Sequence, residues 1–119
     1  MYRKLARSGP APPKSLGEVE TQVFYFINAC RTRPQFAAKQ LQKHLKHYQG
    51  TKCTKKNKNL MTNEGADAVQ EAINELKAKK PIEALEWNDM LAKASTDHVK
   101  DTGPKGITGH TGSDKSSAE

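Results

Sequence analysis

Two helical patterns separated by one proline decide the fold class, and they lie in residues 16–48, LGEVETQVFYFINACRTRPQFAAKQLQKHLKHY. In the first pattern, apolar side chains recur every three or four residues, at Val19, Val23, Phe26, Ile27 and Cys30. This spacing predicts an amphipathic helix over residues 16–31. Ser15 is expected to cap that helix, because Glu18 follows at the spacing of a capping box.

The second pattern begins at Pro34, and proline is favoured at the first position of a helix. Its apolar stripe consists of Phe36, Ala37, Leu41, Leu45 and Tyr48. We expect this helix to end at Gly50. Residues 50–60, GTKCTKKNKNL, are predicted to form a charged loop.

Two further helices are expected in the second half of the chain. The first follows a cap at Thr62 and Asn63, and its buried stripe is predicted to be Ala66, Val69, Ala72, Ile73 and Leu76. The second is capped by Asn88, presents Leu91, Ala94, Ser95 and His98 on one face, and closes at Gly103–Pro104. Trp87 is expected to anchor the core beside it. No segment shows a clear strand pattern, so the chain is predicted to be mainly α, with about four helices, long loops and little strand.

The composition is compatible with a single domain of modest core. The chain has 119 residues, of which 34% are hydrophobic and 6% aromatic. Residues 1–15 are predicted to be a basic, proline-rich arm, and residues 16–119 the domain. No apolar run approaches the length that spans a membrane, and the N-terminal residues lack the apolar core of a signal peptide. An intracellular location, cytoplasmic or cytoskeletal and ciliary, is therefore expected, with Cys30 and Cys53 as free thiols.

The charge of the chain is unevenly distributed. The formal net charge is +7, and no acidic residue occurs between Glu20 and Glu64. Nine basic residues lie in that interval: Arg31, Arg33, Lys39, Lys43, Lys46, Lys52, Lys55, Lys56 and Lys58. Such a field attracts acidic surfaces, so these residues are the candidate partner-binding set. An acidic protein assembly such as a microtubule or ciliary lattice is the first expectation, with ribonucleoprotein, nucleic acid or anionic lipid also open. The alternative is a solvated lysine-rich face.

One cluster suggests a metal. His98 and Asp101 are three residues apart on the predicted fourth helix, and His110 follows in the next loop. Imidazole and carboxylate together bind zinc and similar divalent ions. The alternative is a hydrogen bond at the end of a helix.

Three stretches form a recognisable series along the chain: FINACRTRP at residues 26–34, LEWNDMLAKA at residues 85–94 and GHTGSDKSS at residues 109–117. Together they resemble the CAP superfamily, the SCP-like group of cysteine-rich secretory, antigen and pathogenesis-related proteins. The resemblance implies the front portion of an α-β-α sandwich whose cleft holds two histidines and two acidic residues. Only His110 matches that set, and Lys115 stands where the family's loop has glycine. The other cleft residues are expected in segments beyond Glu119.

These observations predict a non-catalytic structural or interaction protein rather than an enzyme, with no cofactor. It is built on an incomplete CAP domain and docks through its basic surface onto an acidic assembly. The alternative is binding of a divalent metal, lipid or sterol in a CAP cleft, should a C-terminal half follow this chain.

Overall fold

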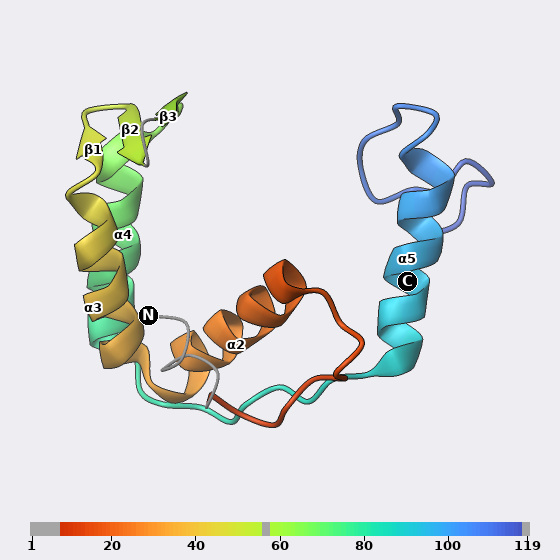
Figure 1. Cartoon of the computed structure of the whole chain (residues 1–119), viewed down its shortest axis with the longest axis horizontal. Coiled ribbons are helices and arrows are strands. Elements are labelled where there is room, and N and C mark those ends of the chain that lie inside the picture. The colour runs from red at the N-terminus through yellow and green to blue at the C-terminus, as the bar shows by residue number, and fades with distance from the viewer. Residues whose placement is uncertain (1–7, 56–57, 118–119) are drawn as a thin grey trace. The chain divides into compact units, whose positions relative to one another are not determined.

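The computed structural model describes residues 8–55 and 58–117, which form a mainly helical protein with one small sheet (Figure 1). The chain divides into two compact units, residues 1–87 and residues 88–119. Each unit is treated by itself below.

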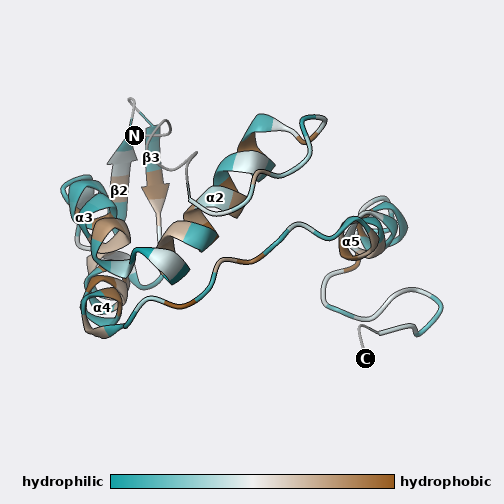
Figure 2. Cartoon of the chain, turned by 90° about the horizontal axis from the view of Figure 1, so that it is seen from below, coloured by the Kyte–Doolittle hydropathy of each residue, from teal (hydrophilic) through white to brown (hydrophobic). Residues whose placement is uncertain are grey.

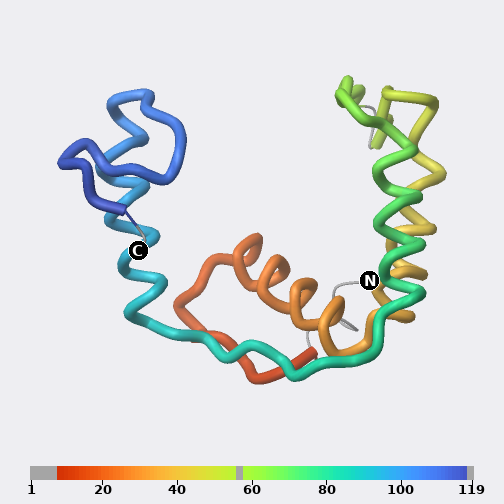
Figure 3. Tube along the Cα trace, turned by 180° about the vertical axis from the view of Figure 1, so that it is seen from behind, coloured from red at the N-terminus to blue at the C-terminus, as the bar shows by residue number. Residues whose placement is uncertain are grey.

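Two helices side by side form the centre of the first unit. They are α3 (Pro34–Leu45) and α4 (Gly65–Ala78), and they run antiparallel (Figures 1 and 3). Pro34 stands at the start of α3, as predicted. Ala37 and Ala38 are buried on α3, and their small side chains allow another helix to approach closely. Ile73 is fully buried on α4 and the rest of its predicted stripe is at least half-buried, which confirms that stripe.

A three-stranded antiparallel sheet connects these two helices, where the sequence predicted helix and then charged loop. Its strands are β1 (Tyr48–Gln49), β2 (Lys52–Lys55) and β3 (Lys58–Met61), in that order. Both predictions were wrong here: the helix ends at Leu45, and most of residues 50–60 are in strands. The strands lack alternating apolar residues because almost all their side chains are at least partly exposed. Only Cys53 is buried among them in the described part.

Gly65 allows α4 to begin directly beneath the turn between β1 and β2. Its backbone has a φ of +66°, in the region that favours glycine. A Cβ at this position would lie 2.4 Å from the carbonyl oxygen of Gly50. The predicted cap at Thr62 and Asn63 is replaced by Glu64, whose side chain makes no capping hydrogen bond.

Helix α2 (Glu18–Thr32) packs on α3 with a different face from the predicted one. Tyr25, Asn28 and Ala29 are its buried residues. The expected stripe is largely exposed instead, with Val19 at 72%, Val23 at 54% and Ile27 at 43%. The predicted cap at Ser15 was also wrong, since Gly17 occupies the N-cap and no side chain caps the helix. Figure 2 shows the mixture of hydrophobic and hydrophilic residues along α2.

An extended segment before Trp87 is bound along α2, which explains why a polar residue is buried there. The Asn28 side chain donates from Nδ2 to the Leu85 carbonyl oxygen at 3.0 Å, and its Oδ1 accepts from the Leu85 N–H at 2.7 Å. Arg31 donates from Nε to the Glu83 carbonyl oxygen at 2.8 Å. The Trp87 ring lies edge-on to Phe24, with 5.6 Å between centroids. Trp87 therefore packs on Phe24 of α2.

The second unit consists of α5 (Asp89–Thr102) and the residues that fold back on it. The Asn88 side chain accepts a hydrogen bond from the Leu91 N–H at 3.0 Å, which confirms the predicted cap. Met90, Leu91 and Val99 are exposed on this helix. In the described part of the chain, no helix combines the length and the apolar character needed to cross a membrane.

Candidate functional site

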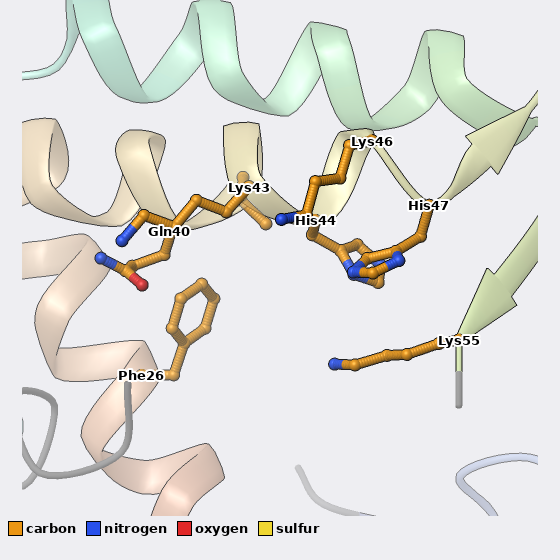
Figure 4. A pocket seen from close by; sticks show the side chains of 8 residues that line it. Phe26, Gln40, Lys43, His44, Lys46, His47 and Lys55 are labelled. Carbon is orange, nitrogen blue, oxygen red and sulfur yellow. The ribbon is translucent and has the colours of Figure 1, made fainter.

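A basic pocket of about 290 Å³ lies between α2, the C-terminal half of α3 and β2 (Figure 4). Five of its lining side chains are basic: Lys43, His44, Lys46, His47 and Lys55. The remaining lining residues are Phe26, Gln40 and Leu41, so no carboxylate contributes to the wall among the described residues. The pocket therefore combines several positive charges with an apolar portion.

Helical spacing and one turn of the sheet bring the basic groups together. Lys43 and His44 follow Gln40 by three and four residues on α3, and His47 follows His44 by three residues just after the helix, so these side chains lie near one side of its C-terminal end. The β1–β2 turn then returns the chain, and the Thr54 N–H donates to the His47 carbonyl oxygen at 2.8 Å. In Figure 4 the Lys55 side chain reaches from β2 toward the two imidazoles.

The two imidazoles of this pocket lie close together in a positively charged environment. The ring centroids of His44 and His47 are 5.9 Å apart, and His44 lies edge-on to Tyr48 at 5.4 Å. Partial burial lowers the pKa of His44, and the charges of Lys55 and His47 lower it further. All three causes disfavour a proton on His44. A negative charge bound in the pocket would oppose the effects of Lys55 and His47 on this pKa.

Gln40 contributes an unsatisfied polar atom to the same pocket. The residue is only 7% exposed, and its Oε1 has no hydrogen-bond partner among the described residues. Buried polar atoms are normally hydrogen-bonded. Figure 4 shows the Gln40 amide beside the Phe26 ring, which points from α2 toward α3. The lining of the pocket thus contains a buried acceptor without a partner among the described residues, as well as cations.

The nine basic residues predicted to bind a partner fall into different settings. Lys43, Lys46 and Lys55 line the pocket, whereas Lys39, Lys52 and Lys58 do not. Lys56 lies outside the described residues.

The two arginines of that set make contacts within the first unit. Arg31 binds the Glu83 carbonyl oxygen. Arg33 donates from Nη2 to the Ser8 hydroxyl, and its guanidinium lies over the Phe36 ring at 4.6 Å from the centroid. Arg31 thus holds the extended segment of residues 82–85, and Arg33 holds part of the predicted arm, where Ser8 is buried.

The charge distribution had placed Lys43, Lys46 and Lys55 in the candidate set, but it did not identify Phe26, Gln40 or Leu41 as lining residues. The helical spacing of Gln40, His44 and His47 was the signal available for the glutamine. Nothing in the sequence indicated that Phe26 lines a basic pocket, because it was expected to be part of the apolar stripe of residues 16–31.

Of the predicted cluster of His98, Asp101 and His110, the first two form hydrogen bonds that attach the following loop to α5. His98 Nε2 lies 2.9 Å from the Gly109 carbonyl oxygen. Asp101 accepts hydrogen bonds from Lys105 Nζ at 2.7 Å, from Ser113 Oγ at 2.6 Å and from the Ser113 N–H at 2.8 Å. These donors, first the Lys105 ammonium, hold the pKa of the Asp101 carboxyl well below its usual range.

His110 itself is exposed in the loop. Across residues 8–55 and 58–117, no group of three or more histidine, cysteine, aspartate or glutamate side chains is placed to hold a metal ion. Both cysteines are free.

Comparisons with family models, with curated proteins and with solved structures found no match to this chain.

Proposed function

We propose that this chain is a non-catalytic interaction protein that docks through its basic pocket onto an acidic protein assembly. The observation that carries the proposal is the convergence of three lysines and two histidines on one pocket that no carboxylate of the described residues lines. Uncompensated positive charge in a concave surface focuses the electrostatic field and attracts an acidic partner. We propose an intracellular setting, such as a cytoskeletal or ciliary lattice.

The arrangement suits binding better than catalysis. The Asp101 carboxylate and the Ser113 hydroxyl, which lie 2.6 Å apart, are both engaged with Lys105 in holding the loop. Among the described residues that line the pocket, no carboxylate stands beside the histidines to orient a ring for general base catalysis. Several cations without a lining carboxylate among the described residues support a binding role for this pocket.

We also propose that the helices correspond to the front portion of a CAP sandwich. Two of the three stretches that resemble the family contact one another, since Asn28 of the first binds Leu85 of the second through two hydrogen bonds. Lys115, which stands where the family has glycine, has a φ of +69° in the region that favours glycine. Exposed Val19 and Val23 on α2 fit elements that pack on a further layer. Metal or lipid binding in a CAP cleft would need ligands besides His110.

The docking proposal is tested by binding of the full chain to a soluble acidic polymer, polyglutamate, at increasing salt. The affinity is expected to fall as salt rises, because exposed charges are screened. The double variant Lys43→Gln/Lys55→Gln removes two pocket charges. Its matched control, Lys39→Gln/Lys58→Gln, removes one lysine from the same helix and one from the strand paired with β2, so the net charge changes equally.

The pocket variant is expected to weaken binding about tenfold or more, and the control only about twofold. Equal losses in the two variants would contradict docking through the pocket. Binding indifferent to salt would contradict the electrostatic account as a whole.

A further inference from the structure

The lining of the basic pocket indicates two chemical requirements, or demands, that a ligand has to meet. The first is negative charge, because Lys43, Lys46 and Lys55 surround two imidazoles without an acidic neighbour in the lining. The second is a hydrogen-bond donor, because the Oε1 of Gln40 is buried and unpartnered among the described residues. A ligand that meets only one demand leaves the other unsatisfied.

The charge demand favours a phosphomonoester over a carboxylate. A phosphomonoester carries about −1.5 to −2 charges near pH 7 and presents three strong acceptor oxygens. Those three oxygens can accept from lysine ammonium and imidazole donors arriving from different sides. Here the donors come from both α3 and β2, with Lys55 reaching toward the imidazoles of His44 and His47 (Figure 4). A carboxylate has one charge and two oxygens, so it neutralises less of the positive charge and accepts hydrogen bonds from fewer of these donors.

The donor demand favours a phosphate that is carried by a peptide. A phosphomonoester dianion has no hydrogen to donate, and neither does a phosphodiester, so in a nucleic acid or a phospholipid the donor has to come from a base, a sugar hydroxyl or a headgroup. A peptide supplies a backbone N–H close to its phosphorylated side chain. The Phe26 ring provides an apolar wall beside Gln40, against which the Cβ or methyl group of the phosphorylated residue can pack.

We propose that the pocket takes a phosphoserine or phosphothreonine of an acidic partner protein, with the phosphate bound by Lys43, Lys55 and His44. Gln40 Oε1 accepts a backbone N–H of the bound segment, and Phe26 contacts its apolar atoms. This inference rests on the proposed docking function, since it names the group that the docking surface recognises.

Binding at this pocket is linked to protons. The groups facing His44 are Lys43, Lys46 and His47 near the end of α3 and Lys55 on β2, while α2 contributes only the uncharged Phe26. Burial, Lys55 and His47 lower the pKa of His44, and the negative charge of a bound phosphate raises that pKa again. Affinity should therefore increase as the pH falls from about 7.5 to about 6, and the gain should end where the phosphate takes up its own proton, near pH ~6.

The test uses the full chain and three short peptides that are neutral except at one position, which is serine, phosphoserine or glutamate. The phosphoserine peptide is expected to bind at least about tenfold more tightly than either of the others. Lys55→Gln should remove most of that preference, whereas Lys58→Gln, its cross-strand partner outside the pocket, should preserve it.

A further variant separates a bound peptide from bound phosphate alone. Gln40→Met keeps the length of the side chain but lacks the acceptor. It should weaken the phosphoserine peptide several-fold and leave the binding of inorganic phosphate unchanged. Should that variant fail to fold, the Lys55 and Lys58 variants still decide the question.

Three results would overturn the inference. The first is equal affinity for the serine and phosphoserine peptides, and the second is equal affinity for the glutamate and phosphoserine peptides. The third is competition by a single-stranded oligonucleotide or by anionic phospholipid vesicles, at the same phosphate concentration, as strong as by the phosphoserine peptide. If polyglutamate still binds through the pocket in any of these cases, docking stands and only phosphate recognition falls. If polyglutamate does not bind either, both proposals fall.

Discussion

His44 couples the stability of the first unit to pH. In the folded chain its pKa is lowered, chiefly by burial and then by Lys55 and His47, whereas an imidazole in an unfolded chain titrates near pH ~6.5. Below that value the unfolded state binds more protons than the folded one, so stability is lost as the pH falls through about 6.5 toward the lower folded pKa. We expect the free energy of unfolding, measured by urea titration, to decrease between about pH 7.5 and pH 5.5.

Replacing His44 removes this titration. The variant His44→Gln should show a flatter dependence of stability on pH across that interval, whereas His110→Gln, in the exposed loop of the second unit, should retain the original dependence. An unchanged slope in His44→Gln would contradict the assignment.

Lys115 has a backbone conformation that is unfavourable for its residue type. Its φ is +69°, and residues other than glycine lose about 1 kcal/mol or more in this region because Cβ crowds the backbone. The surrounding turn is closed by hydrogen bonds from the Gly112 N–H to the Ser116 carbonyl oxygen at 2.8 Å and from the Lys115 N–H to the Gly112 carbonyl oxygen at 2.9 Å.

Lys115→Gly is therefore expected to stabilise this turn by about 1 kcal/mol, the cost that glycine avoids. Amide hydrogen exchange at Gly112 and Lys115 should slow about fivefold. Lys115→Ala, which retains the Cβ, is the control and should change exchange little. Faster exchange in the glycine variant would show that the lysine side chain contributes more than its backbone strain costs.

Among the elements, the extended segment before Trp87 depends on α2 through one buried amide. Asn28 is fully buried and makes two hydrogen bonds to the backbone of Leu85. Asn28→Ala leaves both backbone groups of Leu85 without that partner and opens a small cavity, so we expect a loss of about 2 to 3 kcal/mol in the free energy of unfolding. Asn74→Ala, on the exposed face of α4, should cost about 0.5 kcal/mol or less.

Circular dichroism during urea titration measures both variants. If Asn28→Ala proves as stable as Asn74→Ala, the Leu85 contacts do not contribute to the folded state.

The elements that could be predicted are those whose signals are local. Pro34 at the start of α3, Asn88 at the cap of α5 and the stripe around Ile73 each depend on neighbouring residues, and all three were confirmed. Which face of α2 is buried depends on packing against α3 and on the hydrogen bonds between Asn28 and Leu85, which are 57 residues apart. The periodicity of Val19 and Val23 therefore predicted the wrong buried face. The strands could not be recognised because pairing between exposed lysines such as Lys55 and Lys58 leaves no hydrophobic alternation.

At the scale of the whole molecule, the two units differ in how much they bury. The first unit buries Ala37, Ala38 and Ile73 on its paired helices, while Thr102 is the buried residue of α5. Short helices without a packed face are marginal in water. We expect amide hydrogens in the middle of α5 to exchange at least about tenfold faster than those around Ile73, because local opening is easier where little apolar surface is buried.

Hydrogen exchange followed by mass spectrometry compares the two helices in one experiment. Slow exchange in α5, equal to that in α4, would show that α5 is protected by contacts outside its own unit.

Only part of the candidate site could be predicted from the sequence, because its lining depends on how the chain folds back on itself. The absence of acids between Glu20 and Glu64 indicates a basic region from sequence alone, because charge is a property of composition. Which lysines converge depends on the β1–β2 turn, which places Lys55 beside α3 while Lys58 stays outside the pocket. Composition therefore indicates the basic region, whereas the β1–β2 turn determines which of its lysines line the pocket.

The position of Trp87 gives this protein a built-in optical probe. It is the chain's one tryptophan, and its ring rests edge-on against Phe24 at the end of the segment that Asn28 and Arg31 hold. Release of that segment would expose the indole to water and shift its fluorescence emission to longer wavelength. Because the pocket lies on other residues, emission reports attachment of the segment to α2 separately from any ligand that binds beside His44.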